Sequence, residues 1–289
     1  MSLVAESPTA GTRAASFAPL PSKEFDTIAG IILDDAGIYL PREKSSLVTA
    51  RLGKRLRHLN MSSFSQYCAL VTSPEGAGER RNMLSALTTN VTSFFRERHH
   101  FEHMQAVSLP PLLKRARDGG RVRIWSAGCS SGQEPYSIAF AILKMEPTAA
   151  ALDIKILATD IDPAIVQVGV KGFYQQREIL EIPEEQRTRW MRPVKDGTRS
   201  FTVSEEARRI VTFRELNLNG AWPMSRPFDV VFCRNVVIYF DRATQAAVWS
   251  NFAKVINPQG WLYIGHSERV YGPAEAEFQS AGATTYRRR

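Results

Sequence analysis

The chain has 289 residues, of which 44% are hydrophobic and 23% are charged, a composition typical of a globular protein long enough for more than one domain. No run of about 18 apolar residues occurs, which excludes a membrane-spanning helix, and the N-terminus lacks the basic start and long apolar core of a signal peptide. The formal net charge of +8 predicts an acidic partner, either nucleic acid, anionic lipid or an acidic protein surface, unless it serves solubility alone.

Two segments precede the part of the chain in which strands are expected. Residues 1–21 are rich in Ala, Ser, Thr and Pro, which predicts a disordered tail. Residues 22–106 carry apolar side chains at helical spacing and are predicted to form an N-terminal helical domain. The helices are expected at 24–36, 42–59, 64–71 and 79–88.

The second of these helices carries a basic arc beside its apolar stripe. The arc consists of Lys44, Arg51, Lys54, Arg55 and His58. One sign of charge dominates it, and acidic residues four positions away are missing, so we expect a docking surface for an acidic helix or nucleic acid. An ordinary solvated helix face is the alternative.

The stretch LTTNVTSFFRERHHF, residues 87–101, combines polar side chains with two adjacent phenylalanines. Phe94 and Phe95 are expected to insert into a core, and Arg96 is a candidate ligand for a carboxylate or substrate. The simpler alternative is a helix cap at Asn90 or Thr92 followed by a surface arginine. His99 and His100 are adjacent and therefore poorly placed for one metal ion, which favours a structural role.

From residue 107 to residue 289, strands alternate with helices, as in a parallel α/β sheet. Pro110 and Pro111 mark the expected junction between the domains. Residues 173–210 depart from the alternation and predict a small antiparallel insertion, with a hairpin turn at Asp196-Gly197. The expected strands begin at Arg121 and cover 154–159, 211–215, 228–233 and 260–265, and a last strand includes Thr285 and Tyr286.

A glycine-bearing loop follows the first of these strands, in the stretch RVRIWSAGCSSGQEPYSIA, residues 121–139. Gly128 and Gly132 allow the backbone to approach a ligand closely, and Pro135 suits the first turn of the following helix. Glu134 would repel a pyrophosphate but could hold a cationic amino group. This favours a nucleoside that carries an ammonium group over a dinucleotide.

Polar side chains also follow the next strands. Asp160 ends the second strand, where nucleotide-binding α/β folds hold ribose hydroxyls, whereas Asp162 is better used as the cap of a helix beginning at Pro163. Asn217 follows the third strand. Glu134, Asp160 and Asn217 therefore fit S-adenosylmethionine, which carries an amino group, a ribose and an adenine.

The sequence contains no motif for a metal site, a disulfide framework or a P-loop. Cys68, Cys129 and Cys233 are odd in number and widely spaced, so they form neither a metal motif nor a disulfide framework, as is usual in a reducing cytosol. No P-loop ending is found. No metal site is expected.

Four motifs together resemble the chemotaxis receptor methyltransferases, the CheR family: LTTNVTSFFRERHHF, WSAGCSSGQEPYSIA, ATDID and FDVVFCRNVVIYF. The resemblance covers about residues 22–289. It implies an N-terminal helical domain (22–106) that docks on the receptor and a class I S-adenosylmethionine-dependent methyltransferase domain (107–289), which is Rossmann-like and contains a small antiparallel β-subdomain.

The resemblance also implies roles for individual residues. Arg96 and Tyr239 would flank the transferred methyl group as catalytic residues, and the basic arc would dock on the receptor. The cofactor would be bound by Asn90, Thr92, Arg96, Gly128, Glu134, Asp160, Asn217, Leu218, Arg234 and Asn235.

The implied activity is methyl transfer from S-adenosylmethionine to receptor glutamates, giving glutamate 5-O-methyl esters and leaving S-adenosylhomocysteine. The expected protein is a monomer in the cytoplasm that is recruited to membrane-bound receptor arrays without inserting into the membrane, and it binds no nucleic acid. Its partners are the helical methylation region of the receptor and, in some relatives, a C-terminal receptor peptide that binds the β-subdomain. A nucleic-acid or small-molecule methyltransferase and an inactive cofactor-binding module remain as alternatives.

Overall fold

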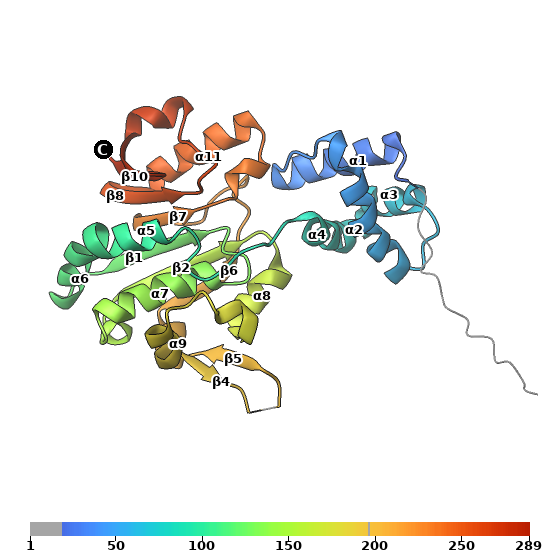
Figure 1. The fold of residues 1–289 in the computed structure, drawn as a ribbon. Coiled ribbons are helices and arrows are strands. Elements are labelled where there is room, and N and C mark those ends of the chain that lie inside the picture. The colour runs from blue at the N-terminus through green and yellow to red at the C-terminus, as the bar shows by residue number, and fades with distance from the viewer. Residues whose placement is uncertain (1–18, 196) are drawn as a thin grey trace, which may run out of the picture. The chain divides into compact units, whose positions relative to one another are not determined.

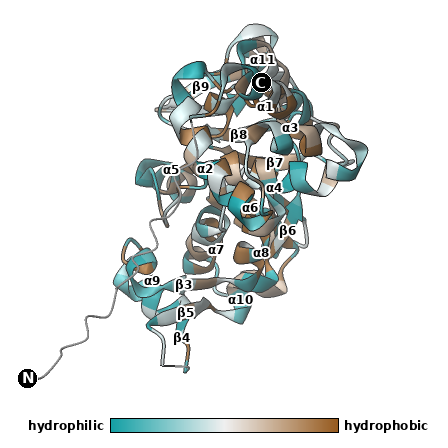
Figure 2. Ribbon diagram, turned by 90° about the vertical axis from the view of Figure 1, so that its right-hand side faces the viewer, coloured by the Kyte–Doolittle hydropathy of each residue, from teal (hydrophilic) through white to brown (hydrophobic). Residues whose placement is uncertain are grey.

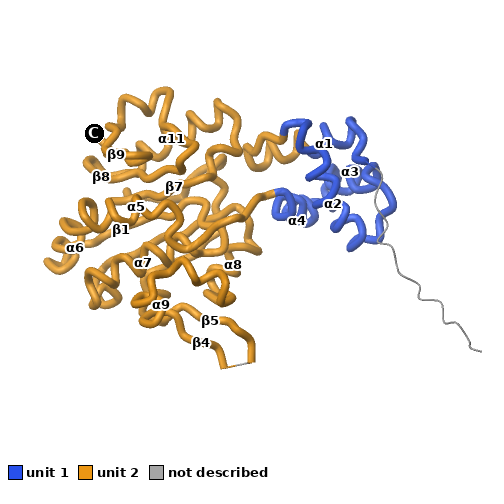
Figure 3. Tube along the Cα trace, in the orientation of Figure 1, with its two compact units in different colours: residues 1–28, 41–87 blue, residues 29–40, 88–289 orange. Residues whose placement is uncertain are grey.

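A computed structural model describes residues 19–195 and 197–289 of the chain (Figure 1). The tail expected at 1–21 lies largely outside the described residues. Two compact units are found, which within these residues consist of 19–28 with 41–87, and of 29–40 with 88–289 (Figure 3). No helix among the described residues is long and apolar enough to cross a membrane.

The first unit is helical, as the apolar spacing predicts. Ser63 caps α3 by accepting a hydrogen bond from the Gln66 N–H, and Val48, Leu52 and Leu56 form the buried stripe of α2. Helix α1 starts in this unit, although its C-terminal part belongs to the second unit. The helices are α1 (Ser22–Ala36), α2 (Ser45–His58), α3 (Phe64–Thr72) and α4 (Ala77–Leu87).

The second unit is built on a seven-stranded sheet with the order β6-β2-β1-β7-β8-β10-β9. Strands β6, β2, β1, β7 and β8 run parallel, and β10 and β9 complete the sheet in antiparallel pairs. The predicted strands are confirmed, although the one expected at 260–265 begins earlier, and β9 was not predicted. The bounds of the strands are β1 (Val122–Ala127), β2 (Ile154–Asp160), β6 (Val211–Glu215), β7 (Phe228–Cys233), β8 (Ile256–Ile264), β9 (Phe278–Gly282) and β10 (Thr285–Arg288).

Helices cover both faces of this sheet, so successive side chains of a central strand enter different cores. Ile124 of β1 belongs to a core that includes Leu113 of α6 and Ile138 of α7, whereas its neighbour Trp125 packs with Trp249 of α11. Strand β7 is therefore buried along its whole length. Figure 2 shows the hydropathy of these strands and of the helices that cover them. The helices are α5 (Arg98–His103), α6 (Leu109–Arg117), α7 (Gln133–Met145), α8 (Pro163–Lys171), α9 (Glu184–Trp190), α10 (Glu205–Arg209) and α11 (Arg242–Val255).

The domain junction expected near residue 106 is placed differently in the structure. Residues 88–106 belong to the second unit. The expectation that Pro110 and Pro111 form a junction is wrong, because both lie in the first turn of α6. The chain is helical without a break from Arg98 to Arg117, and a π-helical segment at Met104–Ser108 directly precedes these prolines.

The predicted antiparallel insertion is confirmed and begins directly after α8. Its strands β3 (Phe173–Gln175), β5 (Ser200–Val203) and β4 (Met191–Pro193) form a separate sheet in that order. Asp196 of the expected turn lies outside the described residues. We call residues 173–210 the β-subdomain.

Candidate active site

The loops that follow β6, β2, β1 and β7 meet at one edge of the sheet, because these strands are neighbours and run parallel. The structure therefore brings together the segments that carry Asn217, Asp160, Glu134 and Arg234. Ligands of open α/β sheets bind at such carboxyl edges.

The loop after β1 is held tightly against its neighbours. Gly128 and Gly132 have positive φ angles of +77° and +97°, and Ser130 has +50°. A Cβ atom on Gly128 would lie 2.3 Å from Cγ2 of Val236, in the turn after β7. Only glycine fits at this position.

Asp160 connects the loop after β1 to the loop after β2. Its Oδ2 accepts a hydrogen bond from the Ser130 N–H at 2.8 Å and its Oδ1 accepts one from the Asp162 N–H at 3.1 Å. The side chain is buried, and this burial raises the pKa of Asp160 despite the backbone donors. Asp162 caps α8 through the N–H groups of Ala164 and Ile165, as predicted, whereas the contact of Asp160 with a ribose stays a prediction.

Asn90 connects the same loops to the segment before α5. Its side-chain amide donates to Asp162 Oδ2 at 3.1 Å, and its carbonyl accepts from the Ser130 hydroxyl at 3.0 Å. The alternative of a helix cap at Asn90 or Thr92 is wrong, since no helix begins at either residue. Phe94 and Phe95 are buried in the core, as expected.

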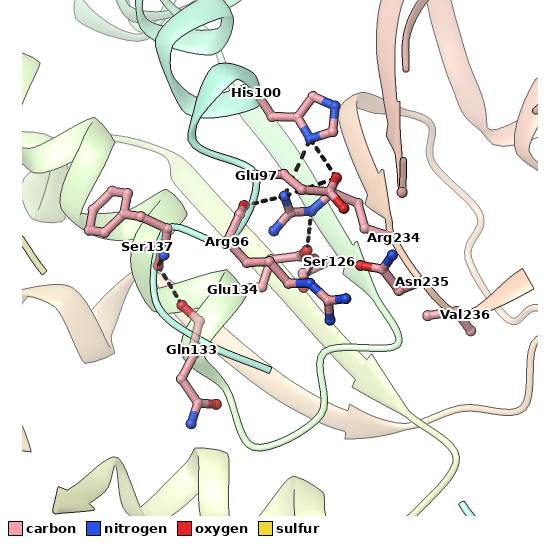
Figure 4. A network of polar contacts seen from close by, with 12 residues as sticks. Arg96, Glu97, His100, Ser126, Gln133, Glu134, Ser137, Arg234, Asn235 and Val236 are labelled. Atoms are coloured by element: carbon pink, nitrogen blue, oxygen red, sulfur yellow. Dashed lines mark hydrogen bonds and ion pairs between the residues drawn. The ribbon is translucent and has the colours of Figure 1, made fainter. Parts of the chain in front are cut away.

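Glu134 and Arg234 form a buried ion pair (Figure 4). Arg234 Nε donates to Glu134 Oε2 at 2.7 Å, and the Ser126 hydroxyl donates to Glu134 Oε1 at 2.7 Å. Nη1 of Arg234 also donates to the carbonyl oxygen of Arg96. The glutamate proposed to hold an amino group is therefore already paired with a guanidinium from the neighbouring strand.

On its other side, the Arg234 guanidinium faces two residues that follow Arg96. It lies 3.7 Å from Glu97 Oε2 and donates to His100 Nδ1 at 3.3 Å. A guanidinium can only donate, so the proton of His100 is on Nε2, which lies 2.8 Å from the Thr284 hydroxyl. Burial and the neighbouring Arg234 lower the pKa of His100 to about 3.

Glu97, His99 and His100 also have ligand atoms within 4.8 Å of one another. Distance alone therefore does not make the adjacent histidines poorly placed for one metal ion, contrary to the expectation from the sequence. Arg234 already contacts both Glu97 Oε2 and His100 Nδ1, however, and a guanidinium disfavours a second cation at the same atoms.

Arg96 and Tyr239 are both half-buried. Nη1 of Arg96 donates to the carbonyl of Val91 at 3.1 Å. The backbone N–H of Tyr239 donates to the Val236 carbonyl at 3.1 Å, and its own carbonyl accepts from the Tyr39 N–H at 2.8 Å. The role of these two side chains at a transferred methyl group stays a prediction.

The structure also gives Asn217 and Leu218 contacts that the sequence did not suggest. Asn217 donates from Nδ2 to the carbonyl of Asp35 at 2.7 Å, and its Oδ1 accepts from the Asn219 N–H at 2.9 Å. Leu218 is buried in the core that contains Trp125. Both atoms of the Asn217 amide thus have partners within the protein, and its contact with an adenine stays a prediction.

Sequence reasoning assigned no role to Ser126, Glu97 or Glu268 and only a structural one to His100, although all four bond residues of this site. Glu97 and His100 stand inside the motif that contains Arg96, which was the available signal for them. Glu268 is distant from every motif, and no signal in the sequence pointed to it.

The basic arc of α2 is only partly available for docking. Arg55 donates from Nε and Nη2 to both carboxylate oxygens of Glu79, at 2.9 and 2.6 Å, and Glu79 is buried. Arg51 Nη1 donates to the carbonyl of Leu87 at 2.7 Å. The view of Arg51 and Arg55 as exposed docking charges is therefore corrected. Lys44, Lys54 and His58 are exposed.

Comparison with known proteins assigns both parts of the chain. Residues 23–88 match the family described as CheR methyltransferase, all-alpha domain, and residues 90–287 match CheR methyltransferase, SAM binding domain. A probable chemotaxis protein methyltransferase of Rhizobium etli is 53% identical over 89% of this chain and 96% of that protein. The chemotaxis protein methyltransferase of Escherichia coli is 37% identical over 92% and 91%.

These matches cover nearly the whole chain and agree with the fold, in which a helical unit is joined to a doubly wound sheet with its loops gathered at the carboxyl edge. The chain therefore belongs to the CheR family, the class I S-adenosylmethionine-dependent methyltransferases that combine an all-helical N-terminal domain with a cofactor-binding catalytic domain.

Proposed function

We propose that this protein transfers a methyl group from S-adenosylmethionine to glutamate side chains on chemoreceptors and forms glutamate 5-O-methyl esters. The observation that carries the proposal is the match of residues 90–287 to the SAM-binding domain of the family, in a fold whose loops after β6, β2, β1 and β7 meet at one sheet edge. The names of the relatives, chemotaxis protein methyltransferases, support the role in chemotaxis.

The residues present fit the cofactor. Oδ1 of Asn235 is buried and has no hydrogen-bond partner among the described residues, which suits a ligand that donates hydrogen bonds. One guanidinium, that of Arg234, lies between the carboxylates of Glu134 and Glu97, and the imidazole of His266 contacts the other oxygen of Glu97 at 2.9 Å, so the two carboxylates outnumber the guanidinium in this cluster. An excess of negative charge favours a ligand with an ammonium group.

The cofactor supplies an electrophilic methyl group. The acceptor carboxylate has an ordinary pKa of about 4.3 and is already ionised at neutral pH, so the protein needs no general base. We assign Arg96 to orienting this carboxylate and Tyr239 to shaping the site beside it. Holding reactants in line can contribute effective molarities of about 10⁵–10⁸ M.

Two surfaces are proposed for the receptor. In the helical unit, exposed Lys44, Lys54 and His58 would attract a segment that presents glutamates. In the β-subdomain, a cavity of about 520 Å³ is lined by Gln175, Gln176, Arg177, Leu180 and Arg199. Its two arginines and the largely exposed Leu180 suit an acidic receptor peptide with an apolar side chain.

The test is a parallel methylation assay with cofactor that carries a labelled methyl group. Chemoreceptor cytoplasmic fragments, RNA, DNA and free amino acids are offered separately. Label is expected in the receptor fragment alone. Label in nucleic acid or in a small molecule would support the alternative methyltransferases, and binding of cofactor without transfer to any acceptor would indicate an inactive cofactor-binding module.

A further inference from the structure

The carboxylate of Glu268 is surrounded by five backbone N–H groups. This residue follows β8, and only 8% of it is exposed. Its Oε2 accepts from Gly265 at 2.6 Å and from Asn235 at 3.0 Å. Its Oε1 accepts from the consecutive residues Val236, Val237 and Ile238 at 3.0, 2.8 and 3.3 Å.

Four of these donors form one turn after β7, and the turn joins two residues of the proposed site. It begins at Asn235, whose φ of +59° lies in the left-handed region that asparagine enters more readily than other residues except glycine. It ends at Tyr239, whose N–H donates to the Val236 carbonyl at 3.1 Å. Consecutive N–H groups that point to one anion form a nest, and the carboxylate that fills a nest fixes its conformation.

The same carboxylate fixes the neighbours of Asn235. It holds Gly265, where a Cβ atom would lie 2.5 Å from Asn235 Nδ2 and 2.7 Å from Asn235 N. It also holds Val236, whose Cγ2 leaves no room for a side chain at Gly128. The turn therefore packs against the glycine loop on one side and the end of β8 on the other.

We propose that Glu268 is a positioning residue for methyl transfer, which holds the Asn235–Tyr239 turn in the conformation that presents both side chains to cofactor and acceptor. The proposal rests on the proposed function for the roles of Asn235 and Tyr239. Glu268 itself acts only through the backbone.

The carboxylate cannot be replaced by an amide of the same shape. In Glu268→Gln, one oxygen can still accept from the turn, but an NH₂ group then faces N–H groups of the nest. In Glu268→Asp both acceptor oxygens remain, although the side chain is one methylene shorter. The aspartate variant should therefore retain more function than the glutamine variant, the opposite of what side-chain length alone predicts.

The experiment is a double-mutant cycle on the affinity for S-adenosylhomocysteine, measured by calorimetry on the full chain. Glu268→Gln and Asn235→Ala are each expected to weaken binding by about tenfold. If Glu268 acts through Asn235, adding Glu268→Gln to Asn235→Ala weakens binding by less than about twofold more. Multiplicative losses in the double variant would overturn the proposal. Glu275→Gln, at an exposed glutamate of the same region, is the matched control and should bind normally.

Turnover gives a second readout that does not depend on folding alone. At saturating cofactor, Glu268→Gln is expected to lower kcat by about tenfold or more and to leave the KM for the receptor fragment unchanged, since displacing a reacting group by about 1 Å can cost about a hundredfold. Wild-type kcat in Glu268→Gln would overturn the proposal. If that variant does not fold, Glu268→Asp replaces it in the same cycle, and additivity there would overturn the proposal equally.

Failure of this inference and failure of the proposed function are distinguishable. A wild-type protein that methylates no receptor would contradict the proposed function, while the affinity cycle would still decide whether Glu268 positions Asn235. A wild-type protein that methylates receptor, together with an additive cycle, would contradict the inference alone.

Discussion

Arg234 Nε lies 2.7 Å from Glu134 Oε2, and the exposed fractions of the two side chains are 2% and 9%. This ion pair joins the end of β7 to the first turn of α7. Since the carboxyl edge of the sheet carries the proposed cofactor site, the pair stabilises the site and the fold together.

Arg234→Ala should destabilise the second unit by about 3–5 kcal/mol, because removing one partner of a buried pair leaves the other charge uncompensated. The measurement is urea-induced unfolding of the full chain. Arg209→Ala is the matched control, because Arg209 and Glu205 form a largely exposed pair that should contribute less than about 1 kcal/mol. Equal unfolding midpoints for Arg234→Ala and wild type would show that the buried pair does not stabilise the unit.

Arg96→Ala should lower single-turnover methylation by about a hundredfold, since removing a preorganised donor from a reacting group typically costs at least this much. Tyr239→Phe should cost about two- to tenfold, as expected for one neutral hydrogen bond. Rapid-quench measurements with saturating cofactor test both variants. Arg98→Ala, at an exposed arginine two positions further on, is the control, and wild-type rates in Arg96→Ala or Tyr239→Phe would remove that residue from the site.

Stability should fall as the pH drops from about 6.5 toward 3, because burial and Arg234 lower the pKa of His100 to about 3 from its usual 6.5. The folded state resists protonation of this group, so its contribution is complete above pH 6.5 and is lost below it. The expected loss at pH 5, relative to neutral pH, is about 2 kcal/mol.

Urea midpoints across this pH range, for wild type and His100→Asn, test the assignment. The variant should show a flatter dependence, since asparagine does not titrate. Parallel curves for the two proteins would mean that another group causes the acid sensitivity.

Lys54→Glu should slow receptor methylation at low salt and make the rate less sensitive to salt, because exposed charges act mainly on association. Lys114→Glu makes the same change of charge on α6 and should have a smaller effect. The measurement is a titration with receptor at two ionic strengths. Equal methylation rates for wild type and Lys54→Glu at low salt would show that the basic arc is an ordinary solvated helix face.

Arg55→Glu should act differently, by unfolding the helical unit. It places a carboxylate beside the buried Glu79, which also accepts from Tyr67 at 2.9 Å. A lower melting temperature than that of Lys54→Glu is therefore expected from circular dichroism.

Local patterns were sufficient for most of the fold. The alternation of residues in β1 and the continuous apolar run of β7 predicted strands, and Asp162 followed by Pro163 predicted the start of α8. These features depend on neighbours in the sequence, which is why single-sequence reasoning finds them.

The contacts that complete the site connect distant parts of the chain and could not be predicted in this way. Arg234 reaches Glu134 across 100 positions, and Glu268 reaches Asn235 across 33. Both contacts depend on the strand order, which local spacing does not determine. For the same reason Arg55 was assigned to the basic arc, since its partner Glu79 lies 24 positions away on another helix.

The central claim is that the transferred methyl group ends on a glutamate carboxylate of a chemoreceptor. The most direct measurement is mass spectrometry of a receptor cytoplasmic fragment after reaction, with digestion at mildly acidic pH to preserve esters and mild alkali applied to a parallel sample. The account predicts a methyl group on glutamate in glutamate-containing peptides, removed by alkali as methanol. An alkali-stable methyl group on lysine, arginine or a backbone nitrogen, or an unmodified receptor, would contradict it.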